Sequence, residues 1–190
     1  MAIDPTQIGG YLINMEVLEA IHTRRSVRKF LSTPVPDDLI NKILAAAMMA
    51  PSAGNQQPWQ FVIIRKREIL DVIPNFHPYS EMVRHAPLAI LVCGDLSLER
   101  FKGYWPFDCS AAIENLLLAA HGLGLGAVWT AAYPEETRIE GFRKLLDLPS
   151  EVVPLALIPV GYPEQSLEKV IRFNRTRIHY DGWKNYGDGQ

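Results

Sequence analysis

The chain has 190 residues, which suits one domain able to bury about 70% of its unfolded surface without a disulfide or a metal. Hydrophobic residues make up 48% and charged residues 21%, a balance that excludes a disordered chain. Nineteen basic and twenty-one acidic residues argue against a nucleic-acid-binding protein. The sequence shows neither a leader peptide nor an uncharged apolar run of about 18 residues, so we expect a cytoplasmic protein without a membrane partner.

Two helices are expected in the first quarter of the chain. Residues 15–23 carry apolar residues at the spacing of a short amphipathic helix, and a basic run follows at 24–29. After Pro34 and Pro36, a second helix is expected to start at Asp37 or Asp38 and to end before Pro51. The first residues, 1–14, are expected to form a loose lead-in.

The rest of the chain mixes strands and helices without strict alternation, which favours an α+β fold over a doubly wound sheet. Buried strands are expected at 59–64 and 87–93, and the helix at 107–123 is apolar on most faces, so it must pack in a core or against a partner. A strand, a helix and a strand then follow at 127–133, 135–146 and 152–160. The two prolines of the last strand argue for an edge or irregular strand. A polar, extended tail is expected over 163–190 of this single 1–190 domain.

Several common site types are not supported by the residue spacing. The run Gly122-Leu-Gly124-Leu-Gly126-Ala127 matches the dinucleotide fingerprint only superficially, because a helix precedes it and a strand follows. These glycines therefore predict a helix end and a turn. The five histidines lack paired spacing and the two cysteines lack a C-x-x-C pattern, so we expect no metal site. Neither cysteine is expected to act as a nucleophile.

Two polar segments are more informative. Arg24, Ser26 and Arg28 alternate, so in an extended turn they would project to one side and converge on a phosphate, unless the cluster is only a solvated face. The segment Pro51-Ser-Ala-Gly-Asn-Gln-Gln-Pro-Trp59 allows close backbone approach and offers the amides of Asn55 and Gln57 to a planar heterocycle. The alternative for this segment is an ordinary polar loop between a helix and a strand.

Taken together, four motifs stand in order and at matching spacing: A-I-x-x-R-R-S-x-R-x-F at 20–30, P-S-A-G-N-Q-Q-P-W-x-F at 51–61, G-L-G-A-V-W at 124–129 and P-V-G-Y-P at 159–163. The chain resembles the FMN-dependent nitroreductase family in this pattern, from about residue 16 to the tail. The resemblance implies a mixed β-sheet flanked by helices. It also implies an intertwined homodimer with two FMN sites at the interface and a C-terminal tail that wraps the partner subunit.

The resemblance also implies roles for individual residues. Arg24, Ser26 and Arg172 are expected to hold the FMN phosphate, and Arg28 to lie near the pyrimidine edge of the flavin. The resemblance places other cofactor-binding positions at Arg25, Pro51, Ser52, Ala53, Asn55, Gln57, Trp129, Thr130, Ala131, Ala132 and Arg175. Some members carry an additional Asn and Lys where this chain has Tyr79 and Met82, and whether Arg84 substitutes is open. Tyr104, Trp105 and Phe107 either wall the substrate site or pack in the core.

The function implied is an oxidoreductase that passes reducing equivalents from NAD(P)H through FMN to nitroaromatic, quinone or similar acceptors by a ping-pong mechanism. The flavin would carry the chemistry, with Arg28 as electrostatic support and no side chain as acid or base. The alternatives are another reaction on the same fold, namely ene reduction, reductive dehalogenation or flavin breakdown, and a flavin-holding protein with little turnover. A nucleic-acid-binding module is the least favoured, because the middle of the chain is acidic.

Overall fold

The computed structural model describes residues 15–186 with the exception of 167 and 169. The expected lead-in at 1–14 and the last four residues of the expected tail lie outside the described residues. In chain order, the helices and strands are α1 (Val17–Thr23), α2 (Asp37–Ala47), β1 (Trp59–Ile64), α3 (Arg67–Leu70), β2 (Leu88–Asp95), α4 (Trp105–Gly122), β3 (Gly126–Ala127), β4 (Thr130–Ala131), α5 (Glu136–Leu146) and β5 (Val152–Gly161). Short 3₁₀ helices are η2 (Ala53–Asn55), η3 (Ile73–Asn75), η4 (Pro78–Arg84), η5 (Leu96–Leu98) and η6 (Arg175–Arg177).

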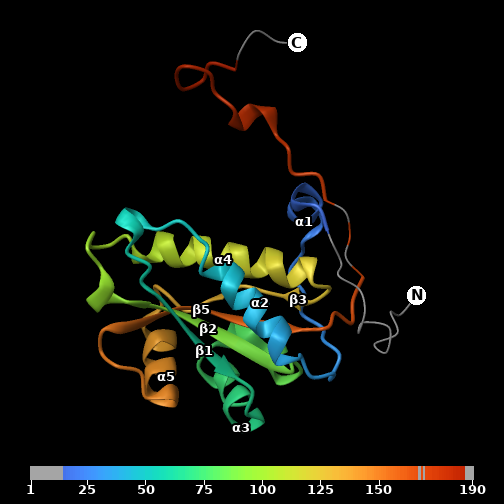
Figure 1. Ribbon diagram of the computed structural model, residues 1–190, viewed down its shortest axis with the longest axis vertical. Coiled ribbons are helices and arrows are strands. Elements are labelled where there is room, and N and C mark those ends of the chain that lie inside the picture. The colour runs from blue at the N-terminus through green and yellow to red at the C-terminus, as the bar shows by residue number, and fades with distance from the viewer. Residues whose placement is uncertain (1–14, 167, 169, 187–190) are drawn as a thin grey trace.

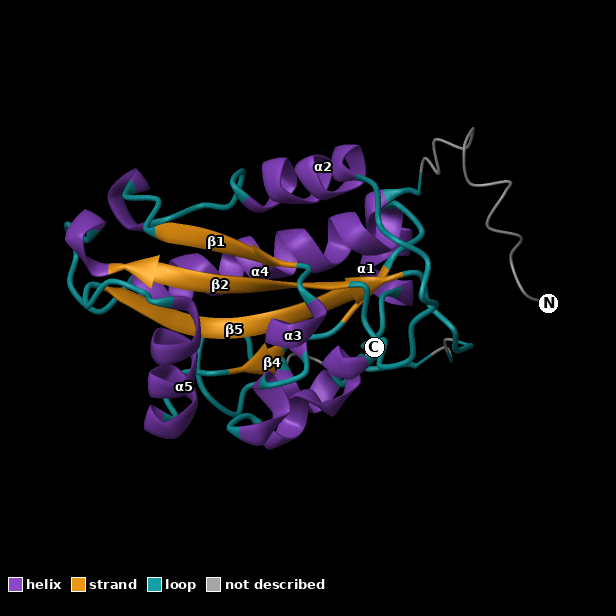
Figure 2. Cartoon of the chain, turned by 90° about the horizontal axis from the view of Figure 1, so that it is seen from below, coloured by secondary structure: helices purple, strands orange, loops and turns teal. Residues whose placement is uncertain are grey.

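The strands form one five-stranded sheet in the order β1-β2-β5-β3, with β4 also paired to β5. Every pairing between these strands is antiparallel. In the described part of the chain, parallel pairing is confined to a bridge between Ser26 and Ala127. Helices cover both faces of the sheet, with α2 and α4 on one side and α3 and α5 on the other (Figures 1 and 2). The expected α+β class is confirmed.

The two prolines of β5 led us to expect an edge or an irregular strand, and the second alternative is confirmed, because β5 lies between β2 and β3 but its pairing is irregular. Pro154 lies at an irregularity, where the register between β2 and β5 shifts beside Cys93. Pro159 faces the gap between β3 and β4, and its carbonyl accepts a hydrogen bond from the Val128 N–H at 3.3 Å. Both prolines lie where the ladder is irregular, so their missing N–H groups cost the sheet little. The same interruption divides the single strand expected at 127–133 into β3 and β4.

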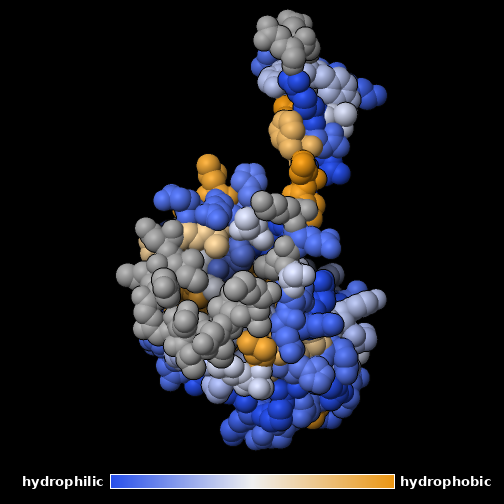
Figure 3. Space-filling view, turned by 90° about the vertical axis from the view of Figure 1, so that its right-hand side faces the viewer, coloured by the Kyte–Doolittle hydropathy of each residue, from blue (hydrophilic) through white to orange (hydrophobic). Residues whose placement is uncertain are grey.

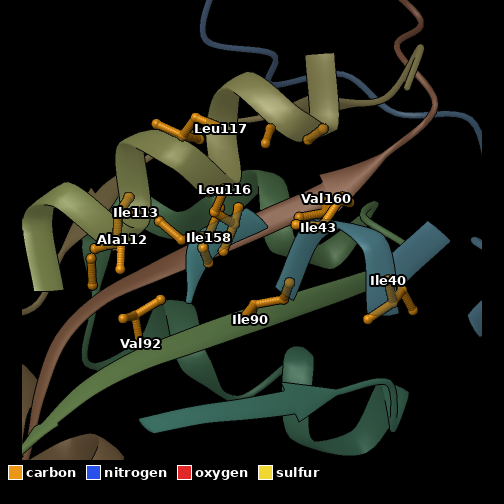
Figure 4. Close-up of a cluster of buried hydrophobic side chains, with 14 of the residues drawn as sticks. Ile40, Ile43, Ile90, Val92, Ala112, Ile113, Leu116, Leu117, Ile158 and Val160 are labelled. Carbon is orange, nitrogen blue, oxygen red and sulfur yellow. The ribbon is translucent and has the colours of Figure 1, made fainter. Parts of the chain in front are cut away.

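The larger hydrophobic core lies between the sheet and the pair α2 and α4 (Figure 4). Sheet residues alternate between the two faces, so that Ile90 and Ile158 face this core while Leu91 and Leu157 face the second one. The second core lies under α3 and α5 and is centred on the fully buried Phe142. Burial of this kind stabilises the fold by about 1.5–3 kcal/mol for each large apolar side chain.

The helix expected at 107–123 is confirmed as α4, which begins two residues earlier, at Trp105. One side of α4 is buried against the sheet and α2, whereas Phe107 is 72% exposed. The helix ends at a turn in which Gly124 has φ of 77° and the Leu125 N–H donates to the Ala120 carbonyl at 2.8 Å. A positive φ favours glycine, which confirms that the glycine run forms a helix end and a turn.

The first helix, α1, turns its apolar face to solvent in this single chain. Val17 and Leu18 are each 70% exposed and Ile21 is 50% exposed, while Ala20 is the residue of this helix that is buried. An amphipathic helix normally buries this face against its own core. The apolar spacing therefore predicted the helix correctly. Its apolar face, however, packs against no surface formed by the described residues.

The tail is extended and stands away from the globular part (Figures 1 and 3). Apart from η6, the described residues after 163 form no helix or strand. Ile171 is 94% exposed and Phe173 is 74% exposed, and hydrophobic atoms, in orange, gather where the tail leaves the body (Figure 3). An extended tail is thus observed, and its wrapping around a partner stays a prediction.

Candidate active site

The segment that carries Arg24, Ser26 and Arg28 runs beside the start of β3. Ser26 is bridged to Ala127, and the Val27 N–H donates to the Ala127 carbonyl at 3.0 Å. This approach requires glycine at 126, because a Cβ there would lie 2.6 Å from the Val27 side chain. Val27 is 1% exposed and packs inward, so its neighbours in this extended segment point away from the core.

A pocket of about 280 Å³ opens where Arg28 meets the residues between β3 and β4. Its walls come from the basic segment, from η4 and the residue before it, from the interrupted strand and from the first turn of α5. Together these residues are Arg28, His77, Tyr79, Met82, Val128, Trp129, Thr130, Ala131 and Arg138. The structure therefore brings Arg28 and the expected strand residues 129–131 to one cavity. Ala132 is fully buried in the second core.

The two arginines at the start of the basic segment have different partners. Arg24 Nε lies 3.4 Å from the Glu114 carboxylate on α4, and the Arg24 side chain is 21% exposed. Arg25 instead donates from Nε to the Glu168 carbonyl at 3.0 Å and from Nη1 to the Arg24 carbonyl at 2.6 Å. Arg25 therefore ties the tail to the basic segment, and the cofactor contact expected for it stays a prediction.

This tie brings Arg172, a basic residue of the tail, near the basic segment. Arg25 Nη2 also donates to the Val170 carbonyl at 3.5 Å, and Arg172 follows only two residues later. Two residues of extended chain span at most about 7 Å, so the Arg172 backbone lies close to the Arg24–Arg28 segment. Arg172 and Arg175 are both exposed.

The loop expected to face a heterocycle is held by a buried polar pair. Asp108 accepts hydrogen bonds from the Ala53 N–H at 2.9 Å and from Gln56 Nε2 at 2.7 Å. The side-chain Oε1 of Gln56 in turn accepts from the backbone N–H groups of Arg100 and Phe101. Gln56 and Asp108 were not among the expected site residues, although an aspartate in the apolar run at 107–123 is a signal for such a buried pair.

The outward side of the same loop presents Ser52, Asn55 and Gln57. Ser52 Oγ accepts from the Gln57 N–H at 3.1 Å, and Gln57 Nε2 donates to Asn55 Oδ1 at 2.8 Å. Asn55 and Gln57 have φ of 55° and 48°, a left-handed conformation that costs energy for residues other than glycine. Pro51, Asn55 and Gln57 are exposed, while Ser52 and Ala53 are half-buried.

Within one chain, this loop and the basic segment lie at different ends of α4. The loop contacts Asp108 at the helix start, whereas Thr23 Oγ1 lies 2.8 Å from His121 Nε2 near the helix end. Asp108 and His121 are separated by roughly 20 Å along a helix that rises 1.5 Å per residue. The structure therefore does not bring residues 51–57 and 24–28 into one cavity in a single chain.

Two pocket residues were missed by the sequence expectations, His77 and Arg138. His77 is fully buried, and neither ring nitrogen makes a hydrogen bond with a described residue. Burial, and next the charge of Arg138, lower the pKa of His77, although the nearby carbonyls of Thr130 and Ala131 oppose this shift. Nothing in the sequence around His77 predicts that it is buried at the pocket. The position of Arg138 could have drawn attention to it, because a cation in the first turn of a helix is unfavourable next to the positive end of the helix dipole.

Of the three aromatic residues left open between a site wall and the core, Trp105 is buried and the other two are exposed. Trp105 is 6% exposed, contacts Tyr133 edge-on at 5.0 Å between ring centroids and packs over Gly94. Tyr104 and Phe107 are 53% and 72% exposed. Trp105 therefore packs in the core, and a role of Tyr104 and Phe107 in walling the substrate site stays a prediction.

Neither cysteine is placed to act as a nucleophile. Cys93 and Cys109 are both fully buried, and Cys109 Sγ donates to the Cys93 carbonyl at 3.6 Å. Burial raises the pKa of Cys93 to about 12 and raises that of Cys109 as well, with the neighbouring Asp108 charge adding to the effect. Thiolate, the reactive form, is therefore scarce at neutral pH.

The described part of the chain offers neither a metal-binding cluster nor a helix that could span a membrane. Residues 15–166, 168 and 170–186 contain no group of three or more His, Cys, Asp or Glu side chains arranged to hold a metal ion. None of the helices described for this chain combines the length and the apolar character needed to cross a bilayer.

Comparison with known proteins bears directly on these motifs. The model of the nitroreductase family matches residues 21–80 and 76–162, which include the basic segment, the polar loop and the sheet. The chain belongs to the nitroreductase family. A protein of Methanothermobacter thermautotrophicus named "Putative NADH dehydrogenase/NAD(P)H nitroreductase" is 52% identical over 176 residues, which cover 93% of this chain and 92% of that protein.

Solved structures agree with this membership. The crystal structure of a protein with the same name from Parabacteroides distasonis is 46% identical, superposes with a TM-score of 0.85, and covers 88% of this chain and 98% of its own. A Desulfovibrio desulfuricans protein, described as "a putative nitroreductase in complex with fmn", is 31% identical with a TM-score of 0.75, covering 90% and 99% of the two chains. The nitroreductase fold of this family member is thus confirmed.

Proposed function

We propose that this family member is an FMN-dependent oxidoreductase that takes reducing equivalents from NAD(P)H and passes them to nitroaromatic, quinone or similar electron-poor acceptors. Donor and acceptor would occupy the same place in turn, which gives ping-pong kinetics. The observation that carries the proposal is the pocket in which Arg28 meets residues 128–131, beside the Arg24 and Ser26 that match the family motif. The relative solved with FMN supports the choice of cofactor.

The residues present fit a flavin mononucleotide chemically. Arg24, Ser26 and the nearby Arg172 offer charged and hydroxyl donors, the set that a phosphate group requires. The pocket beside them combines Arg28 with the flat side chain of Trp129 and with backbone groups of an interrupted strand. Fully buried His77 at the same pocket has ring nitrogens without a protein partner, so a ligand could supply one.

FMN, when bound, would supply the hydride transfer itself. The part left to this chain is binding, orientation and electrostatics. Arg28 would place a fixed positive charge beside the pyrimidine edge, where negative charge develops on reduction. Trp129 and Ala131 border the pocket and would orient the ring system. No described residue of the pocket other than His77 suits proton transfer near neutral pH, and its lowered pKa keeps it neutral.

A second copy of the chain is part of the proposal. One chain separates the loop at 51–57 from the basic segment by most of the length of α4, yet both match the family motif. A homodimer would solve this if the loop of one subunit meets the basic segment of the other. The exposed apolar face of α1 and the exposed Phe107 supply surface that such a dimer would bury.

The experiment is a visible absorption spectrum of the purified protein before and after anaerobic NADH or NADPH. We expect a flavin spectrum that bleaches with one of the two donors, followed by steady donor oxidation when nitrofurazone or menadione is added. A protein that stays colourless after FMN is added would refute the proposal. Bleaching without turnover on these acceptors would favour a flavin-holding protein or another reaction of the family.

The phosphate contact has its own test, a fluorescence titration with FMN. Arg24→Ala should weaken FMN binding by about 1.5–3 kcal/mol, the usual value of a charge-assisted hydrogen bond. The matched control is Arg65→Ala, which removes an arginine that pairs with Asp37 on the surface, away from the pocket. Equal affinities of the two variants would remove Arg24 from the site.

A further inference from the structure

The pocket holds a second guanidinium that the family motif does not account for. Arg138, in the first turn of α5, donates from Nη1 to the Ala131 carbonyl at 2.9 Å. Its Cζ lies 5.2 Å from the centre of the Tyr79 ring, within cation–π distance. These two contacts fix the position of the charged group at the wall that Ala131 and Tyr79 share.

Arg138 is held without a neutralising partner. None of the ion pairs found among the described residues involves Arg138, and no acidic side chain lines the pocket. The side chain is half-buried, so water screens its charge less than that of a fully exposed arginine. An uncompensated cation at this depth is costly unless a ligand brings negative charge to it.

Arg84, the residue considered as a substitute for the lysine of some family members, does not line the pocket. Its Nε lies 2.8 Å from the Glu81 carboxylate, Nη1 donates to the Asp71 carbonyl, and Arg84 is not among the residues that line the pocket. The Arg84 guanidinium is thus paired with Glu81 in η4 and with the nearby Asp71 carbonyl. In this chain the cation that joins Arg28 at the pocket comes from α5 instead.

None of the side chains that line the pocket with Arg138 carries a negative charge. Arg28 adds a second positive charge, Tyr79 and Met82 are uncharged, and His77 is kept neutral by burial and by Arg138 itself. The pocket therefore presents two positive charges, of which that of Arg138 is held in place, and no negative charge among its lining residues. Such a field stabilises a ligand more strongly after the ligand gains negative charge than before.

We infer that Arg138 acts with Arg28 as a paired electrostatic support for the negative charge that FMN acquires on two-electron reduction, and so raises the reduction potential of the bound cofactor. This inference rests on the proposed function. No bond is made or broken by Arg138, and its effect is the ratio between the affinities for reduced and oxidised FMN. A tenfold change in that ratio equals about 30 mV for a two-electron couple.

The test is the midpoint potential of the FMN-loaded protein, measured by equilibration with a reference dye. Arg138→Gln and Arg138→Met should lower the ratio of reduced to oxidised affinity about tenfold, a fall of about 30 mV. Arg138→Lys should restore most of the potential, because it keeps the charge. The control is Lys144→Gln, which removes one positive charge from an exposed position on the same helix. Circular dichroism on each variant verifies the fold.

The outcomes separate this inference from the proposed function. A wild-type protein that binds no FMN refutes the proposed function, whatever Arg138 does. An FMN-loaded Arg138→Gln variant with an unchanged potential overturns the inference alone. So does an unchanged potential with a raised KM for 4-nitrobenzoate but not for neutral nitrobenzene, since that result would assign Arg138 to an anionic substrate. A fall in potential equal to that of Lys144→Gln overturns it too, because the effect would not be specific to the pocket.

Discussion

At the scale of single residues, the candidate site depends on a few buried polar groups. Asp108 is 5% exposed and Gln56 is 7% exposed, and together they accept hydrogen bonds from the Ala53 N–H in the polar loop and from the N–H groups of Arg100 and Phe101 before α4. A buried carboxylate that accepts two hydrogen bonds organises the loop, whereas the same group without donors would be expensive. This pair explains why Asn55 and Gln57 hold their left-handed backbone conformation.

Asp108→Ala should lower the free energy of unfolding by about 2–4 kcal/mol, because it leaves buried donors of Ala53 and Gln56 without a partner. The measurement is urea unfolding followed by circular dichroism. Asp38→Ala serves as the control, since Asp38 forms an exposed pair with Lys42 at 3.5 Å on α2 and should change stability by less than about 0.5 kcal/mol. Similar losses in the two variants would contradict the proposed role of the buried pair.

His77 makes stability depend on pH in a defined direction. Because its pKa is lowered in the folded protein, the unfolded chain binds a proton more readily than the folded one. The stability that neutral His77 contributes is therefore fully present above the ordinary histidine pKa of about 6.5. This contribution decreases as the pH falls below that value. Burial lowers the pKa of His121 as well, with the charges of Arg24 and Arg25 contributing, so both histidines act in the same sense.

The measurement is the urea midpoint of wild type and His77→Phe between pH 5 and 8. We expect the wild type to lose stability on acidification below about pH 6.5 and the variant to lose less, because one titrating group is gone. The remaining slope in the variant is the contribution of His121 and other groups. Parallel curves for the two proteins would show that His77 does not titrate differently in the folded state.

At the scale of elements, the interrupted strand between β3 and β4 positions the pocket. Pro159 in β5 has no N–H to donate opposite Val128, although the Pro159 carbonyl accepts from the Val128 N–H, and Val128 to Ala131 line the pocket. Gly126 then lets the basic segment pack against the start of the same strand. Proline and glycine usually weaken a sheet, but here Pro159 and Gly126 shape the strand that borders the pocket.

Two glycines of one turn give a matched test of this packing. Gly126→Ala should destabilise the protein by about 1–3 kcal/mol, because the new Cβ would collide with Val27 and push the basic segment away from β3. It should weaken FMN binding at the same time. Gly122→Ala meets no atom within 4 Å at the end of α4 and should stabilise by up to about 1 kcal/mol. Urea unfolding and FMN titration of both variants check this, and equal behaviour would contradict it.

At the scale of the whole molecule, the single chain leaves too much apolar surface exposed to be the working unit that we propose. The exposed face of α1, the outward Phe107 and the tail residues Ile171 and Phe173 come from distant parts of the sequence. Figure 3 shows hydrophobic atoms on the body near the foot of the tail. A second copy that covers these surfaces would also complete the flavin site.

Light scattering coupled to gel filtration should give twice the mass of one chain. Leu18→Glu, which puts a charge on the 70%-exposed apolar face of α1, should shift the protein toward monomer and reduce bound FMN in parallel. Val72→Glu is the control, since Val72 is 41% exposed beside α3 on the other side of the sheet. A monomeric wild type that binds one FMN tightly would contradict the dimer.

Local chemistry in the sequence determined the class of fold, the order of the helices and strands and the family, because apolar spacing and the Arg24–Arg28 and Pro51–Trp59 motifs are read within short windows. Tertiary structure decided what depends on contacts between distant residues. These are the central place of β5, the buried pair of Gln56 with Asp108, and the meeting of Arg28 with Arg138. No short window contains both members of such a pair, so their proximity follows only from the packing of the whole chain.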